Sequence, residues 1–218
     1  GLGPDRMNDG AISIQPQPTW SDEDRARAEH YALIARLFHA APDAALLAAL
    51  AQAGRTLGGE AGELPRAWAA LGAAAQAMPL QAVADEFDAL FVSVGKPDVM
   101  SNGSWYLTGF LQEEPLAELR DDLAELGLGR RPGVTETEDH IAALAEVMRH
   151  LVLTGPDEAG LERQRQFFSR HIAPWYAQFA GALAAAPGAD FYAKVGGLLA
   201  AFMDIEREAF DMLEAEAR

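Results

Sequence analysis

Cysteine is absent from the sequence of 218 residues. Its absence excludes a disulfide framework, an iron–sulfur cluster held by thiolates and any catalytic cysteine, and it is typical of a reducing compartment. Long apolar runs are also missing: the stretch Val195–Met203 has only nine residues, whereas a membrane-spanning helix needs about 20. No secretory signal pattern is visible. We therefore expect no membrane insertion.

Clusters of basic residues are missing as well. Seventeen Lys and Arg stand against thirty-three Asp and Glu, which gives a formal net charge of −16. A nucleic-acid-binding surface needs grouped Lys and Arg, so we expect no nucleic-acid partner. An acidic protein instead attracts basic partners, for example a peptide with paired arginines. Surplus acid also simply keeps a protein soluble, and on charge alone this is the simpler interpretation.

The composition and the apolar pattern indicate a helical protein. Half of the residues are hydrophobic, apolar positions recur at spacings of three and four, and no stretch alternates as a strand would. The sequence predicts an all-α, single-domain bundle of about nine helices in residues 19–218. Residues 1–18 are predicted to be disordered. We interpret residues 1–6 as an expression remnant before a native start at Met7.

Several predicted helices have well-marked starts and faces. The first begins at Ser21, which three acids follow. A helix over about residues 80–94 presents Phe87, Phe91 and Val94 on its apolar face. This position favours a core role for the two phenylalanines over a role as ligand contacts.

Two further helices lie near the end of the chain. A long one carries an apolar stripe over residues 168–183, with Pro174 inside it. Because proline removes a helical N–H and clashes with the preceding turn, we expect a kink at this position. The last helix follows Pro187-Gly188 and presents Ile205 on its apolar face.

The segment after the Arg130-Arg131 pair is the most unusual one. Thr135 and Glu138 have the spacing of a capping box, which predicts that a helix starts here. The run Glu136-Thr137-Glu138-Asp139-His140 would then place three acids and a histidine in the first helical turns. Acids at a helix N-terminus complement its dipole without any further function. A binding role is the alternative, and these residues alone leave both open.

Motifs for catalysis or for metal binding are not found. None of the five histidines has glutamate three residues before it, as the metal sites of helical bundles require. The serines lack the G-x-S-x-G pattern. Asp139 and His140 would point about 100° apart on a helix, so they cannot form an orienter–base pair. We predict that the protein is not an enzyme and holds no metal. A helical enzyme or nucleotide-binding module of unknown substrate is the alternative function.

Four segments occur in a recognisable order. They are Phe87-Asp88-Ala89-Leu90-Phe91, Ser104-Trp105-Tyr106-Leu107, Glu136-Thr137-Glu138-Asp139-His140 and His171-Ile172-Ala173-Pro174-Trp175. They resemble the aromatic-x-x-L-F, S-x-Y-L, E-P-x-D-H and H-x-x-P-W elements of the TorD/DmsD (NarJ-like) family of redox-enzyme maturation chaperones, over about residues 83–209. Thr137 stands where that family usually has proline, which would leave the turn less rigid.

The resemblance carries expectations about function. It implies an all-helical cytoplasmic chaperone that binds the twin-arginine leader or the apo form of a molybdoenzyme-type redox subunit, with formate dehydrogenase as one candidate. The chaperone would assist cofactor insertion before export. The resemblance also implies weak guanine-nucleotide binding, and no other cofactor is expected. Because some members exchange helices, we expect a monomer or a domain-swapped dimer, with residues 95–103 or 127–133 as hinges.

An apolar, basic leader requires a groove with hydrophobic walls and acids at one end. The candidate peptide-binding residues are Phe87, Phe91, Trp105, Tyr106, Glu136, Glu138, Asp139, His140, His171 and Trp175. The aromatic side chains would form the walls, the acids would bind arginine, and residues 171–175 would shape the floor. Trp105 and Tyr106 could equally fill the interior of the bundle.

Overall fold

The computed structural model describes residues 20–111 and 113–218, so the predicted disordered segment 1–18 lies outside the described residues. Over the described range the chain forms ten α-helices and one short π-helix, and it contains no strand. The all-α prediction is confirmed, with one α-helix more than expected. No helix in this range is both long enough and apolar enough to cross a membrane.

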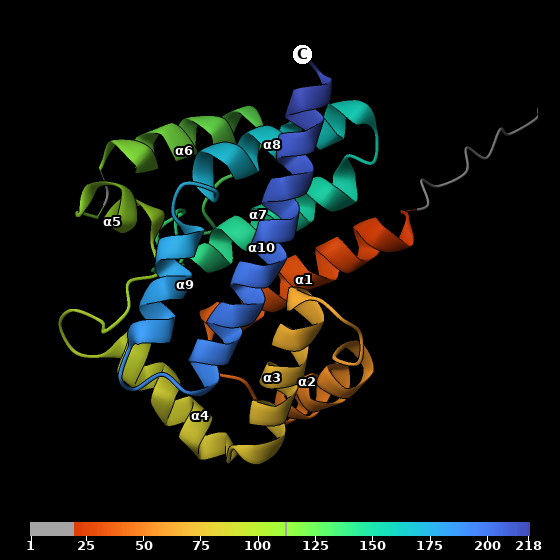
Figure 1. Ribbon diagram of the computed structural model, residues 1–218. Coiled ribbons are helices and arrows are strands. Elements are labelled where there is room, and N and C mark those ends of the chain that lie inside the picture. The colour runs from red at the N-terminus through yellow and green to blue at the C-terminus, as the bar shows by residue number, and fades with distance from the viewer. Residues whose placement is uncertain (1–19, 112) are drawn as a thin grey trace, which may run out of the picture.

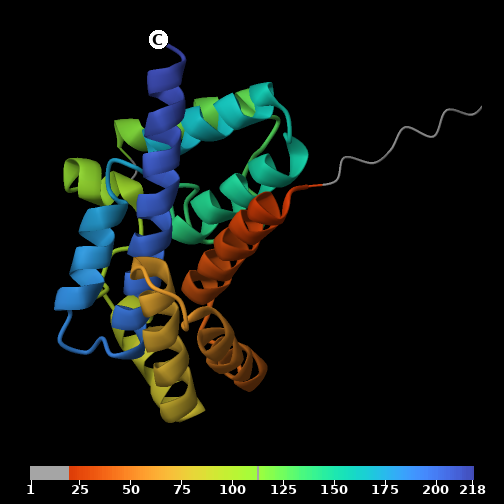
Figure 2. The same ribbon diagram turned by 45° about the vertical axis from the view of Figure 1, so that its right-hand side comes forward.

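The helices form a layered bundle (Figures 1 and 2). In chain order they are α1 (Asp22–His39), α2 (Ala44–Leu57), α3 (Glu63–Ala77), α4 (Leu80–Phe87), the π-helix η1 (Asp88–Val92), α5 (Gly103–Thr108), α6 (Glu114–Glu125), α7 (Ile141–Thr154), α8 (Glu158–His171), α9 (Tyr176–Ala185) and α10 (Phe191–Glu216). Helix α1 packs along α7, α2 packs along α3, and α10 packs against both α3 and α9. In both views α2, α3 and α4 lie at one end of the molecule, and α5, α6 and α8 lie at the other.

The first helix forms as its sequence predicts. The Ser21 side chain accepts a hydrogen bond from the Asp24 N–H at 3.0 Å and caps α1. Tyr31, Ile34 and Phe38 lie on one face of α1 and are buried. Burial of an apolar face of this kind supplies most of the stability of a helix in a protein.

Two predicted helix boundaries are wrong. The helix expected over residues 80–94 passes into the π-helix η1 and ends at Val92, and Val94 is fully exposed instead of buried. The stripe over residues 168–183 is divided between α8 and α9 rather than carried by one kinked helix. The chain turns at residues 172–175, because Pro174 has no N–H with which to continue the helical hydrogen bonds.

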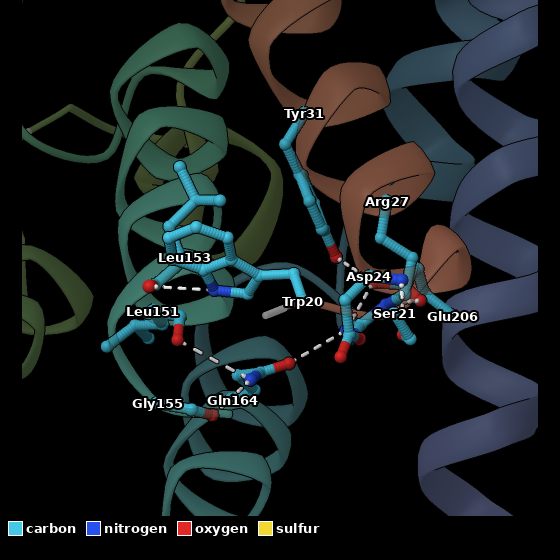
Figure 3. Close-up of polar contacts among 10 residues, drawn as sticks. All are labelled: Trp20, Ser21, Asp24, Arg27, Tyr31, Leu151, Leu153, Gly155, Gln164 and Glu206. Atoms are coloured by element: carbon cyan, nitrogen blue, oxygen red, sulfur yellow. Dashed lines mark hydrogen bonds and ion pairs between the residues drawn. The ribbon is translucent and has the colours of Figure 1, made fainter. Parts of the chain in front are cut away.

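A buried charge network joins α1 to α10 (Figure 3). Arg27 donates to both oxygens of Glu206 at 2.9 Å, and the Tyr31 hydroxyl donates to the same carboxylate at 2.7 Å. The pattern placed Ile205 in the core, yet its side chain is 48% exposed and Glu206 is 3% exposed. The prediction for Ile205 is therefore wrong, because the ion pair with Arg27 places the next residue, Glu206, in the interior.

The same network extends to the middle of α8 and, through Gln164, to the end of α7. Arg27 also donates to the Gln164 side chain at 2.9 Å, and Trp20 Nε1 donates to the Leu153 carbonyl at 3.0 Å. Burial opposes the charge on Arg27, but Glu206 outweighs it and raises the pKa of Arg27. Burial beside Glu206 also raises the pKa of the Tyr31 hydroxyl, which keeps it a hydrogen-bond donor.

Candidate functional site

The segment before α7 pairs with the segment that starts α5. Asn102 and His140 form an isolated antiparallel bridge. The Gly103 N–H donates to the Asp139 carbonyl at 3.0 Å, and the Ile141 N–H donates to the Ser101 carbonyl at 2.9 Å. Two of the four family-like segments therefore lie side by side, although more than 30 residues separate them along the chain.

The Asp139 carboxylate fixes this pairing. It is 4% exposed and accepts from the Ser104 N–H at 2.9 Å, the Ser104 hydroxyl at 2.5 Å, the Asn102 amide at 3.1 Å and the Thr137 hydroxyl at 2.5 Å. Burial opposes its ionisation, but these hydrogen bonds outweigh burial and lower the pKa of Asp139. Both of its oxygens already have protein partners, so its direct role is to hold α5 against α7.

The predicted capping box does not form. Helix α7 begins at Ile141, and His140 is its N-cap, with Nδ1 accepting from the Ala142 N–H at 3.1 Å. Thr137 and Asp139 bond to the start of α5 instead, which prevents this segment from entering the helix. Burial lowers the pKa of His140 against the opposing charges of Glu136 and Asp139. A neutral ring with an unprotonated Nδ1 fits its capping role.

Thr137 fixes the turn before α7 by hydrogen bonds, whereas a proline at this position would fix it by its rigid ring. Its hydroxyl donates to Asp139 and accepts from the Asn102 amide at 2.9 Å. We expect Thr137→Val to lower the free energy of unfolding by about 1 kcal/mol, because two hydrogen bonds disappear with little change of shape. Urea unfolding would measure this loss, with exposed Thr135→Val as the control. Equal stability of the two variants would contradict the role of the hydroxyl.

Glu138 lies between two arginines. Its Oε2 accepts from Arg120 Nε at 2.5 Å, and its Oε1 lies 3.9 Å from Arg130 Nε. The hydrogen bond to Glu138 raises the pKa of Arg120. Glu136, on the same segment, is half-buried. The three predicted acids thus occupy three different environments, and only Asp139 has its oxygens fully used by uncharged donors.

Aromatic packing brings in the segment between α8 and α9. Tyr106 stacks on Trp175, with ring centroids 5.4 Å apart and planes at 16°. The Tyr106 hydroxyl donates to the Met100 carbonyl at 2.6 Å, and burial raises its pKa to about 12. Gly103 packs against the same indole, where an added Cβ would lie 2.8 Å from Trp175 Nε1. Tyr106 therefore helps to fill the bundle interior, one of the two alternatives.

Phe87 and Phe91 belong to an adjoining aromatic cluster. Both contact Tyr192, and Phe91 also contacts Phe38. Phe38 in turn contacts Phe179, whose ring lies 6.1 Å from that of Tyr106. The prediction that Phe87 belongs to the core is confirmed, and Phe91 packs against the core while partly exposed. The first segment thus connects to the second through Phe38 and Phe179. The second stacks on the fourth and hydrogen-bonds to the third.

A more accessible apolar surface lies on and after α5. Trp105 is partly exposed, and the Lys96 ammonium lies 4.2 Å from the centre of its ring. Leu107, Phe110 and Leu111 are exposed, and Phe110 has 66% of its surface accessible. Large exposed side chains grouped in this way are typical of a binding surface. We call Trp105, Leu107, Phe110 and Leu111 the α5 surface.

His171 connects α8 to α6. Its Nε2 lies 2.6 Å from Asp122 Oδ2, and Arg170 also donates to Asp122. Burial lowers the pKa of His171 although the carboxylate opposes this shift. Burial also opposes ionisation of Asp122, but the bonds from His171 and Arg170 outweigh it and lower the pKa of Asp122. His171 is 7% exposed, so it supports the site from below rather than lining its surface.

The described residues contain no group of three histidines or acids that could hold a metal ion. What they provide is a junction of α5, α6 and the start of α7, where acidic side chains and exposed apolar side chains occur close together. Such a junction can bind a cationic and apolar segment.

A family model described as nitrate reductase delta subunit matches residues 58–181, which is more than half of the chain. The chain belongs to this family. The match runs from α3 into α9 and includes every segment of the junction. The family membership predicted from the four segments is confirmed.

Curated relatives of this member of the nitrate reductase delta subunit family have the name chaperone protein TorD. The protein of that name from Vibrio cholerae serotype O1 is 26% identical over 142 residues, which are 62% of this chain and 64% of the relative. The one from Photobacterium profundum is 26% identical over 133 residues, or 57% of this chain and 62% of the relative. The chain spans less than two thirds of these relatives. Their names are those of chaperones.

Several site residues of this family member escaped prediction from sequence. Asn102 and Ser104 hold Asp139, Arg120 holds Glu138, and Asp122 holds His171. Ser104 stood in one of the four segments and could have been named from it. Arg120 offered a weaker signal, as the one basic residue in the acidic helix α6.

Proposed function

We propose that this protein is a maturation chaperone for a redox-enzyme precursor, and that it binds the basic, apolar leader of the catalytic subunit. The observation that carries the proposal is the similarity to relatives named chaperone protein TorD within the nitrate reductase delta subunit family. The client would be a molybdoenzyme-type subunit, with formate dehydrogenase as one candidate. The chaperone would hold the precursor in the cytoplasm until its cofactor is inserted.

The chemistry of the junction supports this proposal. A leader with two arginines and an apolar stretch needs carboxylates and an apolar surface within reach of each other. Glu136 and Glu138 supply carboxylates, and the α5 surface supplies apolar area. Asp139, His140, His171 and Trp175 act in this proposal by positioning these groups. Phe87, Phe91 and Tyr106 support the wall from the core side.

The charge of the protein favours the same partner. With a formal net charge of −16 the molecule attracts a cationic peptide over a distance, and added salt screens this attraction. Weak guanine-nucleotide binding, which the family resemblance implies, is a separate proposal. Titration of the protein with GTP, alone and with leader peptide, tests it directly.

We expect leader peptides from the same organism to bind in titration calorimetry, because they match the junction in charge and in apolar character. Replacing both leader arginines with glutamine should weaken binding at least about tenfold, since charge-assisted hydrogen bonds are lost. A peptide from the mature part of the same enzyme is the control. Absence of binding to any leader, together with turnover of a small molecule, would reject the chaperone in favour of an enzyme.

A further inference from the structure

The Glu138 carboxylate is buried but incompletely bonded. Its side chain is 9% exposed, and Oε2 is engaged by Arg120 at 2.5 Å. The other oxygen, Oε1, is buried from solvent and has no hydrogen-bond partner among the described residues. A buried charged oxygen without a donor is unfavourable, so Oε1 has unused capacity for a cationic donor.

The cation that faces Oε1 does not satisfy it. Arg130 Nε lies 3.9 Å away, which is too far for a hydrogen bond. The Arg130 guanidinium donates instead to the Val134 carbonyl within its own loop. Arg130 therefore neutralises part of the charge on Glu138 and covers it. The hydrogen bonds of the two groups are made with other partners: Glu138 bonds to Arg120, and Arg130 bonds to the Val134 carbonyl.

The loop that carries Arg130 is suited to movement. Gly127 and Gly133 lie at its two ends with φ of 72° and 82°, and an added Cβ at either position would meet no atom within 4 Å. Arg130 and its neighbour Arg131 are exposed between them. Leu128 of the same loop packs against the core, but Arg130 can leave Glu138 by rotation of its own exposed side chain while Leu128 stays in place.

We propose that Glu138 receives one arginine of the leader, and that Arg130 occupies this place in the free protein as an internal competitor. This inference rests on the proposed function and adds the specific receptor and its regulation. A guanidinium has five N–H donors and binds a carboxylate in a bidentate manner. An incoming arginine can therefore bond to Oε1, which Arg130 does not, while Arg120 stays on Oε2.

The other two acids of the segment are less suited to this role. Asp139 accepts four hydrogen bonds from Asn102, Ser104 and Thr137 and holds the fold together. Glu136 is partly buried, and neither of its oxygens is both buried and without a hydrogen-bond partner in the described part of the chain. Glu138 is the acid of the three that combines burial with an unbonded oxygen.

The test uses the full chain, a synthetic peptide with two consecutive arginines before an apolar stretch, and the same peptide with both arginines changed to glutamine. We expect Arg130→Gln to bind the arginine peptide about tenfold more tightly than the parent, because the competitor is gone. Binding of the glutamine peptide should not change. Arg131→Gln is the matched control: it alters net charge equally, but Arg131 makes no ion pair with Glu138.

Glu138→Gln supplies the second half of the test. It should weaken binding of the arginine peptide about tenfold and remove any gain from Arg130→Gln in the double variant, because both act through one carboxylate. Circular dichroism and thermal unfolding would confirm that each variant is folded. In NMR spectra the Arg130 Nε–H signal should move towards its solvent-exposed position on saturation with the arginine peptide, while the Arg120 signal keeps its paired position.

The two proposals fail in different ways. If the parent protein binds the arginine peptide, but Arg130→Gln and Arg131→Gln have equal effects or the Arg130 signal does not move, the competitor model is overturned and the chaperone proposal stands. If the parent and all variants bind neither peptide, the leader-binding function itself is rejected, and the inference with it.

Discussion

Replacement of Glu206 with alanine is expected to lower the free energy of unfolding by about 3–5 kcal/mol, the usual cost of removing one partner from a buried ion pair. The Arg27 side chain is 13% exposed and donates to both oxygens of Glu206. In the variant its charge would stay buried with only Asp24 and Gln164 as partners. The Tyr31 hydroxyl would lose its acceptor as well.

Two further variants make this prediction specific. Glu208→Ala removes an exposed acid two residues along the same helix, and we expect a change within about 0.5 kcal/mol. The double variant Arg27→Met with Glu206→Leu should recover most of the lost stability, because apolar groups replace the whole pair. Urea unfolding measures all three. A loss below about 1 kcal/mol for Glu206→Ala would mean that the pair is solvated in solution.

Asp139→Asn is expected to lower the free energy of unfolding by about 1.5–3 kcal/mol. An asparagine amide group would face the Ser104 N–H and hydroxyl or the Asn102 amide, so at least one donor would meet another donor. Loss of these bonds would weaken the attachment of the start of α5 to the start of α7, and the backbone bonds between Gly103 and Asp139 and between Ile141 and Ser101 would remain. Asp121→Asn is the matched control, because Asp121 is an exposed aspartate on α6.

The effect of Asp139 also depends on pH in a defined direction. The pKa of Asp139 is lower in the folded protein than in the unfolded chain. Its ionised form therefore stabilises the fold at pH values above about 4, and this contribution is lost as the pH falls through the folded pKa. The difference in unfolding free energy between parent and Asp139→Asn should shrink over this acidic range. A difference that stays constant down to about pH 2 would contradict the assignment.

The fold was largely predictable because apolar periodicity is a local property. The buried face of α1, its start at Ser21 and the burial of Phe87 all follow from residues close together in the chain. The exposed Ile205 shows the limit of prediction from apolar periodicity. Glu206 is buried because Arg27 lies opposite it, 179 positions away in sequence, and no periodic pattern contains that information.

The sequence predicted which residues lie at the site better than it predicted how these residues are arranged. Thr135 and Glu138 satisfy the spacing of a capping box, but Asp139 and Thr137 bond to residues of α5, and this tertiary contact delays the helix to Ile141. The proline in the fourth segment correctly indicated a disturbed helix. The proline alone does not show whether the helix kinks or ends, and the structure has it end at His171 and a new helix begin at Tyr176.

The hydrogen bonds between Ser104 and Asp139 bear on how this chain can change during evolution. Four donors converge on one carboxylate from two distant segments. A substitution at Asn102 or Ser104 leaves that carboxylate short of a donor, so it is tolerated best when Asp139 changes too. These positions should be inherited as a set. Glu138 projects from the same turn, but it pairs with Arg120 and does not belong to this set.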